Sequence, residues 1–254
     1  MPRLSGDVVA IRKSAARQFA VLIHAGAARV VPSSLWLLES LLPSRCACCD
    51  APGPTACPAC VAALAFLRPP FCALCGAPTA WPVGRCRECS GRRLAFASAR
   101  AAVRYTGSAP RFVHAWKERG LRPFADHAAE LVVERVACPP ADVITYIPPD
   151  GDRSLKRGYQ PAQGLARALG RSWRLEVAPL VARARPVERQ TALGRRERRR
   201  NMRGAFTARG TPPPHVLLID DVYTTGATVA AAAAALRAAG ARQVDVVTFA
   251  RAVR

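Results

Sequence analysis

The sequence has few acidic residues, few lysines and few aromatic residues. Its 254 residues include 38 basic and 17 acidic side chains, for a net charge of +21, and lysine occurs only at positions 13, 117 and 156. This shortage of acid predicts attraction to polyanions such as phosphorylated ligands, nucleic acids or anionic membrane surfaces. Because half of the residues are hydrophobic, the chain can bury a core, which excludes a disordered protein.

A long apolar run is also missing. No segment approaches the roughly 18 apolar residues that a membrane-spanning helix needs, and the best candidate, Phe19–Val31, is interrupted by His24 and Arg29. Residues 1–28 have no clean apolar centre between their basic residues, so a signal peptide is not expected. We therefore expect a cytoplasmic protein.

Cysteine, in contrast, is concentrated in one region. Nine of the ten cysteines lie between Cys46 and Cys89, and eight of them form C-x-x-C pairs. The pairs are Cys46/Cys49, Cys57/Cys60, Cys72/Cys75 and Cys86/Cys89. Two residues between thiolates let a tight turn aim both sulfurs at one tetrahedral metal, and two such turns complete a four-cysteine site. The spacing predicts two structural zinc sites, paired in sequence order as the simplest assignment or interleaved as the alternative.

Other uses of the cysteines are less consistent with the pattern. A disulfide framework is typical of oxidising compartments, and redox C-x-x-C motifs do not occur four in a row. The four histidines have no ligand spacing with one another or with the cysteines, so none is assigned to metal.

Proline and glycine divide the rest of the chain. We expect a basic extension at residues 1–33, a double zinc ribbon at 34–95 that begins with a helix at 34–42, and a third region at 96–254. Strands are expected at 96–105, 143–147, 216–219 and 243–249. Helices are expected at 110–119, at 125–136, at 161–169 before Gly170, and from the loop after Asp221 to Ala239. Apolar strands that alternate with helices indicate an α/β fold with a doubly wound, mainly parallel sheet.

The most informative segment is VLLIDDVYTTGAT, residues 216–228. A buried strand here ends in Asp220 and Asp221, at the edge where open α/β sheets bind ligands. The next turn opens a helix, whose free N–H groups and positive dipole form an anion cradle. An acid pair beside a phosphate cradle suits a ribose 5-phosphate. The alternative is an acidic strand end followed by an ordinary helix N-cap at Thr224 or Thr225.

This segment resembles the motif of type I phosphoribosyltransferases that binds 5-phosphoribosyl 1-pyrophosphate (PRPP), although the position of Tyr223 is usually aliphatic there. From about Leu37 onward the chain resembles the ComF family, competence-type proteins that join a zinc ribbon to a phosphoribosyltransferase domain. Segments in the family's order also include residues 116–120 (WKERG), 153–159 (RSLKRGY), 189–190 (RQ) and 198–206 (RRRNMRGAF). Where the family more often reads RGFNQA, this chain has RGYQPA, so Gln160 and Pro161 differ.

The resemblance implies a type I phosphoribosyltransferase-like domain at residues 96–254 that binds PRPP with Mg²⁺. Asp220 and Asp221 would hold the ribose 2′- and 3′-hydroxyls, directly or through Mg²⁺. The 5′-phosphate would bind to Thr224, Thr225, Gly226, Ala227 and Thr228. Arg153, Lys156 and Arg157 would face the pyrophosphate, in keeping with the fit of arginine to phosphate oxygens; the alternative for Lys156 and Arg157 is a solvated turn.

A second polyanion site is suggested by the charge of residues 151–210, which hold 16 basic and four acidic side chains. Its densest run is Arg195, Arg196, Arg198, Arg199 and Arg200. This run is either a solvated surface, the usual meaning of such charge, or a surface that follows the backbone of single-stranded DNA.

Three functions are compatible with these features. The first is a phosphoribosyltransferase that acts on PRPP and an unidentified acceptor, in the service of DNA uptake. The second is a non-catalytic factor that binds single-stranded nucleic acid and works with DNA-uptake proteins. The third is a PRPP sensor with a vestigial transferase site. The acid pair and the cradle support ligand binding in all three.

Overall fold

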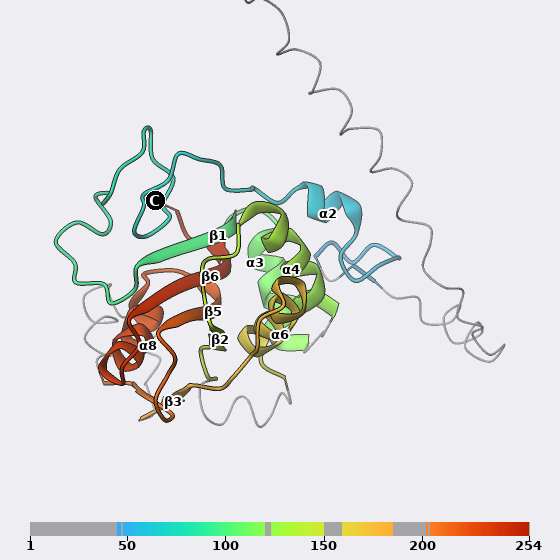
Figure 1. The fold of residues 1–254 in the computed structure, drawn as a ribbon. Helices are drawn as coiled ribbons and strands as arrows, with labels where there is room; N and C mark the ends of the chain where they lie inside the picture. The colour runs from blue at the N-terminus through green and yellow to red at the C-terminus, as the bar shows by residue number, and fades with distance from the viewer. Residues whose placement is uncertain are drawn as a thin grey trace, which may run out of the picture. The chain divides into compact units, whose positions relative to one another are not determined.

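The computed structural model describes residues 45–46, 48–119, 123–149, 159–184, 202 and 204–253. These residues belong to the unit Ser44–Arg254. Its centre is a four-stranded parallel sheet in the order β1-β6-β5-β2 (Figure 1). The strands are β1 (Ser98–Arg104), β2 (Val143–Tyr146), β5 (His215–Tyr223) and β6 (Gln243–Arg251). The expected mainly parallel α/β sheet is therefore confirmed. Two short strands, β3 (Val181–Arg183) and β4 (Phe206–Ala208), pair antiparallel beside it.

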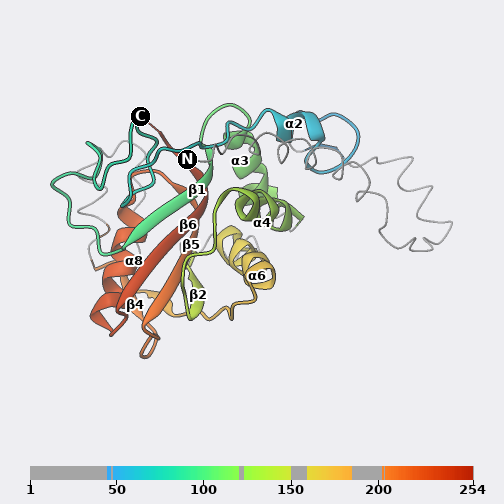
Figure 2. The same cartoon turned by 45° about the horizontal axis from the view of Figure 1, so that its top comes forward.

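Helices cover both faces of this sheet (Figures 1 and 2). These are α3 (Ala109–Arg119), α4 (Pro123–Arg135) and α6 (Pro161–Trp173) on one face and α8 (Ala227–Ala238) on the other. A further short helix, α2 (Pro58–Ala62), belongs to the cysteine region. Leu217 and Ile219 of β5 pack in the same core cluster as α3, α4 and α6. Val216 and Leu218 pack in the cluster that contains α8. Burial on both faces explains why the strand is a continuous apolar run.

Both edges of the sheet are covered by irregular chain. Along β1, the Leu67 N–H donates to the Ala102 carbonyl at 2.9 Å and the Ala99 N–H to the Leu74 carbonyl at 2.8 Å. Along β2, the Ile144 N–H donates to the Glu176 carbonyl at 2.8 Å. These contacts occupy backbone groups that an open edge would leave free for other chains. The chain around Leu67 and Leu74, in the cysteine region, is thus part of the sheet's boundary.

Two expected element ends are wrong. The helix expected to stop before Gly170 continues to Trp173 and ends at Arg174, whose φ of 56° breaks the helix. Gly170 is an interior position where the next segment crosses closely, because a Cβ there would lie 2.6 Å from Val177 Cγ2 and 2.9 Å from the Leu175 carbonyl oxygen. The glycine therefore permits close packing instead of ending the helix.

The strand expected at 216–219 runs on to Tyr223, because pairing with β6 continues to Tyr223 opposite Arg251. The other expected strands and helices of residues 96–253 are present, with ends that differ by a few residues. The helix expected at 34–42 and the extension at 1–33 lie outside the described residues. Within the described ranges, no helix combines the length and the apolar character needed to cross a bilayer.

Substituting Gly170 with alanine tests this packing. Alanine is the better helix former by about 1 kcal/mol, so propensity alone predicts a more stable protein. We expect Gly170→Ala to lower the free energy of unfolding by about 1–3 kcal/mol, because the added methyl overlaps Val177 and the Leu175 carbonyl. Chemical denaturation measures the difference, and an increase in stability would contradict the close crossing.

Candidate functional site

The two aspartates lie at the carboxyl edge of the sheet, past the end of β2. Pairing of β2 with β5 ends at Tyr146 opposite Ile219, and the Ile147 N–H then donates to the Ile219 carbonyl at 2.9 Å. β5 remains paired with β6 on its other side, with Asp220 opposite Thr248. The acid pair is therefore held by β6 while it extends beyond β2. This preserves the expected location, although the strand does not end at the aspartates.

Lys117, to which the sequence analysis assigned no role, forms an ion pair with one of the two aspartates. Lys117 of α3 places Nζ 2.5 Å from Asp221 Oδ2, and the two side chains are 36% and 12% exposed. Burial disfavours the lysine's charge, but the Asp221 carboxylate outweighs this effect and raises the pKa of Lys117. The available signal was the position of Lys117 beside Trp116, a fully buried residue of α3. Such a lysine at the end of a packed helix has to meet a carboxylate or extend to solvent.

Asp220 has a perturbed acidity. Burial, followed by the neighbouring charge of Asp221, raises the pKa of Asp220 to about 8. The Asp221 N–H donates to Asp220 Oδ1 at 2.9 Å, which fixes the two carboxyl groups relative to the strand. When both carboxyl groups are ionised, Lys117 balances only one of their two negative charges. A divalent cation bound there would displace the Asp220 proton.

The loop of residues 224–228, called here the threonine loop, leads from β5 into α8. Gly226 is the N-cap of α8, with a φ of 70° that favours glycine. Thr225 Oγ1 accepts a hydrogen bond from the Ala227 N–H at 3.3 Å. The alternative of an ordinary cap at Thr224 or Thr225 is therefore wrong about the capping residue. The start of α8, with its free N–H groups, lies a few residues after the acid pair on the same strand end.

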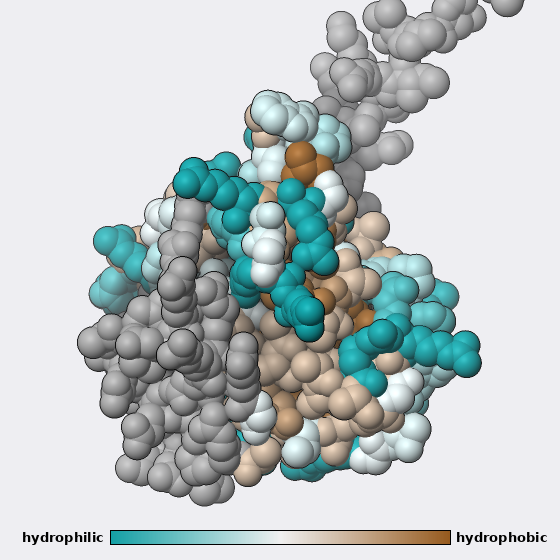
Figure 3. Space-filling model, turned by 90° about the vertical axis from the view of Figure 1, so that its left-hand side faces the viewer, coloured by the Kyte–Doolittle hydropathy of each residue, from teal (hydrophilic) through white to brown (hydrophobic). Residues whose placement is uncertain are grey.

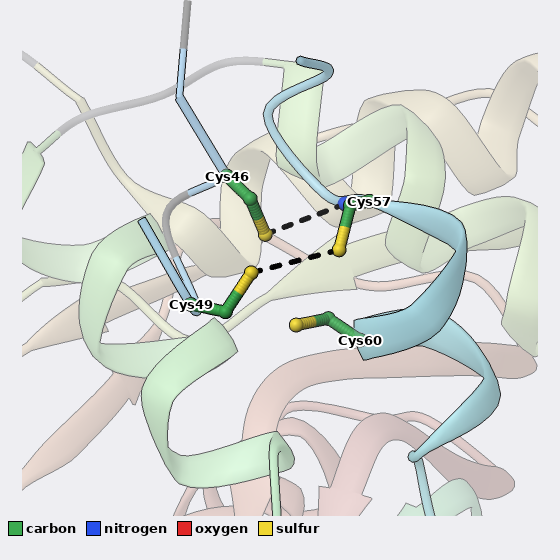
Figure 4. A group of neighbouring side chains, drawn as sticks. All are labelled: Cys46, Cys49, Cys57 and Cys60. Carbon is green, nitrogen blue, oxygen red and sulfur yellow. Dashed lines mark hydrogen bonds between the residues drawn. The ribbon is translucent and has the colours of Figure 1, made fainter. Parts of the chain in front are cut away.

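The structure gathers the eight paired cysteines into two groups. Cys46, Cys49, Cys57 and Cys60 form one, and Cys72, Cys75, Cys86 and Cys89 the other, with all sulfurs of a group within 4.8 Å of one another. This is the expected pairing in sequence order. In the first group the sulfurs point toward a common centre between a loop and the start of α2 (Figure 4).

Distances within the groups fit zinc. Sulfurs about 2.3 Å from a tetrahedral zinc lie about 3.8 Å from each other. The Sγ atoms of Cys49 and Cys57 are 3.7 Å apart, those of Cys72 and Cys89 3.6 Å, and those of Cys86 and Cys89 3.8 Å. Two four-cysteine groups of this size fit two structural zinc sites.

The protein also prepares one thiolate in each group. The Cys57 N–H donates to Cys46 Sγ at 3.4 Å and the Cys86 N–H to Cys72 Sγ at 3.2 Å. Burial opposes ionisation, but the backbone donors prevail and lower the pKa of Cys46 to about 6 and that of Cys72 to about 7. Cys48 belongs to neither group and packs in the hydrophobic core, where burial raises the pKa of its thiol to about 11.

Several predicted site residues cannot be placed. Arg153, Lys156 and Arg157, expected to face pyrophosphate, lie outside the described residues. The same holds for the expected nucleic-acid run Arg195, Arg196, Arg198, Arg199 and Arg200. The structure thus brings together the acid pair, Lys117 and the threonine loop.

Comparison with known proteins identifies one part of the chain. Residues 37–90 match the family model of the double zinc ribbon domain, which confirms the ribbon expected from the cysteine spacing. Among solved structures, the crystal structure of TT1426 from Thermus thermophilus is similar at 19% identity over 52% of this chain and 83% of that one. Its TM-score of 0.28 carries no argument about the fold. None of the curated proteins matches the chain.

The zinc sites are tested by counting metal. We expect two zinc ions per chain, because each group offers four sulfurs at tetrahedral spacing. Cys60→Ser should reduce the count to one, and Cys48→Ser, which removes a neighbouring thiol outside the groups, should leave two. Elemental analysis of metal-replete protein measures all three, and one zinc or none in the wild type would contradict the two-site interpretation.

Proposed function

We propose that the chain binds PRPP together with Mg²⁺ at the carboxyl edge of β5 and transfers its phosphoribosyl group to an acceptor. The observation that carries this proposal is the meeting of an acid pair, a lysine and a helix N-terminus at one strand end. Acceptors for hydroxyl groups and donors for a phosphate are what a ribose 5-phosphate requires. The resemblance of residues 216–228 to the PRPP motif supports the same ligand.

The donor set suits a Mg²⁺ ion. Magnesium prefers carboxylate oxygens and substrate phosphates and keeps several of its waters. Asp220 and Asp221 offer two carboxyl groups against the single charge of Lys117, so a cation at this position would relieve their repulsion. When bound, Mg²⁺ would neutralise charge on the pyrophosphate as it leaves.

The chain's own residues would orient and shield the sugar. Displacement of pyrophosphate from C1 breaks the C1–O bond and forms a bond from the acceptor to C1, with positive charge on the sugar in between. The acid pair would hold the 2′- and 3′-hydroxyls and stabilise that charge. Threonine-loop donors would fix the 5′-phosphate, and Arg153, Lys156 and Arg157 would attract the leaving pyrophosphate. Lys117 can move from Asp221 to a ligand phosphate, since its side chain is partly exposed.

Enzyme and sensor are distinguished by isotope exchange. A transferase exchanges labelled pyrophosphate into PRPP when its acceptor is present, so the exchange is screened with candidate acceptors; a sensor binds PRPP without exchange under any of them. The ComF resemblance further supports a role in DNA uptake, with DNA-uptake proteins as partners.

Calorimetry tests the PRPP site. We expect wild-type protein to bind PRPP in a Mg²⁺-dependent way, and Asp221→Asn to weaken binding about tenfold or more, because a charged hydrogen-bond partner is lost. Thr225→Val should weaken binding through the phosphate end, because the cradle loses the Thr225 hydroxyl as a donor to the phosphate. The matched control is Asp142→Asn, which removes the same charge beside His215, at the start of β5, and should have little effect.

The acidity of Asp220 adds a pH dependence. Because its pKa is raised to about 8, protons compete with Mg²⁺ below that pH, and PRPP affinity should rise as the pH increases from 6 to about 8.

If calorimetry shows no binding of PRPP by wild-type protein in the presence of Mg²⁺, both the transferase and the sensor are excluded.

A second candidate function, binding of single-stranded nucleic acid, is favoured by one side chain. Trp81 is 69% exposed and, with Val133, is one of the two exposed large hydrophobic residues in the described ranges. It lies in the second ribbon, the part of the double ribbon that holds Cys72, Cys75, Cys86 and Cys89, between its two cysteine pairs. Thr79 Oγ1 donates a hydrogen bond to the Trp81 carbonyl at 2.8 Å. Arg85 and Arg87 follow it and are exposed. Figure 3 shows one side of the molecule, on which strongly hydrophilic side chains lie at several separate places around a mildly hydrophobic centre.

Stacking and charge can be separated in one DNA-binding experiment. Trp81→Ala should weaken binding of a single-stranded oligonucleotide by about 1–3 kcal/mol while leaving the salt dependence unchanged, because a base loses its stacking partner; Trp81→Phe should retain most of the affinity. Neutralising Arg195, Arg196, Arg198, Arg199 and Arg200 together should flatten the salt dependence, because phosphate contacts release counterions. Titrations across salt concentrations measure both, and unchanged binding in all variants would contradict this function.

A further inference from the structure

A buried arginine connects the second zinc ribbon to the end of β5, the strand that leads into the threonine loop. Arg251, the last residue of β6, is 1% exposed. Its Nη1 donates to the Cys75 carbonyl at 2.5 Å and its Nη2 to Glu88 Oε2 at 2.9 Å. Both partners belong to the second ribbon. A buried guanidinium is costly without such partners, so the end of β6 and this ribbon depend on each other.

Tyr223 carries the contact from Arg251 to the loop. The guanidinium carbon of Arg251 lies 4.3 Å from the centre of the Tyr223 ring, a cation–π contact. On the loop side, a Cβ added to Gly226 would lie 2.2 Å from Tyr223 Oη. The 3% exposed Tyr223 side chain thus packs against the glycine that caps α8. An aliphatic residue, usual at this position in the PRPP motif, has no ring for the arginine to contact.

Arg92 forms a second, independent connection. Its Nη2 donates to the Thr225 carbonyl at 2.9 Å, and its Nη1 lies 3.4 Å from the Glu88 carbonyl. The Arg92 N–H also donates to the carbonyl of Cys89, a member of the second cysteine group, at 3.2 Å. One side chain therefore joins the turn that holds Cys86 and Cys89 to the middle of the threonine loop.

The bond to Thr225 sets the direction of a loop donor. A trans peptide is planar, and its C=O and N–H point to opposite sides. By holding the Thr225 carbonyl, Arg92 directs the Gly226 N–H away from itself. Gly226 is also the most flexible residue of the loop, because glycine has the largest choice of backbone conformations. The contact thus fixes the peptide that would otherwise vary most.

We propose that Arg92, Tyr223 and Arg251 are positioning residues through which the second zinc ribbon holds the threonine loop in its anion-binding conformation. The contact to Thr225 comes from Arg92 of the second ribbon, and the contact to Tyr223 comes from Arg251 of β6, whose hydrogen-bond partners Cys75 and Glu88 lie in that ribbon. The first ribbon is therefore assigned no part in this. The proposal rests on the proposed function for the identity of the anion, but the order of the loop can be measured without any ligand.

Arg92→Ala, with Arg93→Ala as the matched control, is the central experiment. Arg93 is the exposed neighbour and carries the same charge. We expect Arg92→Ala to speed amide hydrogen exchange in residues 224–228 and to weaken Mg²⁺–PRPP binding about tenfold, the loss of one hydrogen bond with a charged donor. Zinc content and the melting temperature should remain close to wild type. Arg93→Ala should change neither exchange nor affinity.

Two further pairs separate positioning from general stability. Tyr223→Phe keeps the ring over Arg251 and should retain the exchange pattern, whereas Tyr223→Leu should speed exchange in the loop. Cys89→Ser in the second ribbon should do the same, while Cys60→Ser in the first should leave the loop as in wild type. A general loss of stability would instead speed exchange across the whole sheet for both cysteine variants, which would overturn the proposal.

The outcomes distinguish the two proposals. If wild-type protein does not bind PRPP, the proposed function fails, and hydrogen exchange of the loop alone decides the positioning role. If wild-type protein binds PRPP but Arg92→Ala keeps both wild-type affinity and wild-type loop exchange, the positioning role is overturned and the PRPP site stands.

Discussion

The pairing of β5 with β6 continues four residues beyond the last pair of β5 with β2, and the candidate site depends on this offset. Up to Ile219 the strand is a buried apolar element with neighbours on both sides. Beyond it, β6 alone keeps the backbone extended, so Asp220 and Asp221 are rigidly held without being enclosed by β2. The same pairing brings Tyr223 opposite Arg251. The register of β5 against β6 therefore places both the acid pair and the Tyr223–Arg251 contact that lies next to the threonine loop.

The local signals of the sequence were sufficient for most of the sheet and for both cysteine groups. Spacing alone predicted the groups, because a C-x-x-C turn is a local structure. Features that depend on distant contacts could not be predicted. Gly170 reads as a helix end, yet its role is set by Val177 crossing the helix, and the extent of β5 is set by a partner strand. Lys117 was assigned no role because only the fold brings α3 to Asp221.

The described part of the site does not share the strongly positive charge of the whole chain. The chain has a net charge of +21, but the described part of the site places two carboxyl groups against one lysine. Once Asp220 is ionised, above its pKa of about 8, a purely anionic ligand would be repelled by this pair and attracted by the basic surroundings. A ligand with phosphates at both ends and hydroxyls between them fits both, since its phosphates meet helix N–H groups and basic side chains while its hydroxyls meet the acid pair. The Lys117 contact keeps Asp221 paired before such a ligand arrives.

The double ribbon is joined to the sheet and is more than an appended module. The chain between Cys60 and Cys75 covers β1, and Cys75 and Glu88 of the second ribbon are the partners of the buried Arg251. The threonine loop follows directly on β5 and runs into the first turn of α8. Folding of a four-cysteine site is driven by metal binding. A ribbon bonded to Thr225 through Arg92, and joined to Tyr223 through Arg251, would therefore give the loop a rigid neighbour. The conformational order of the second ribbon and that of the threonine loop would then be coupled.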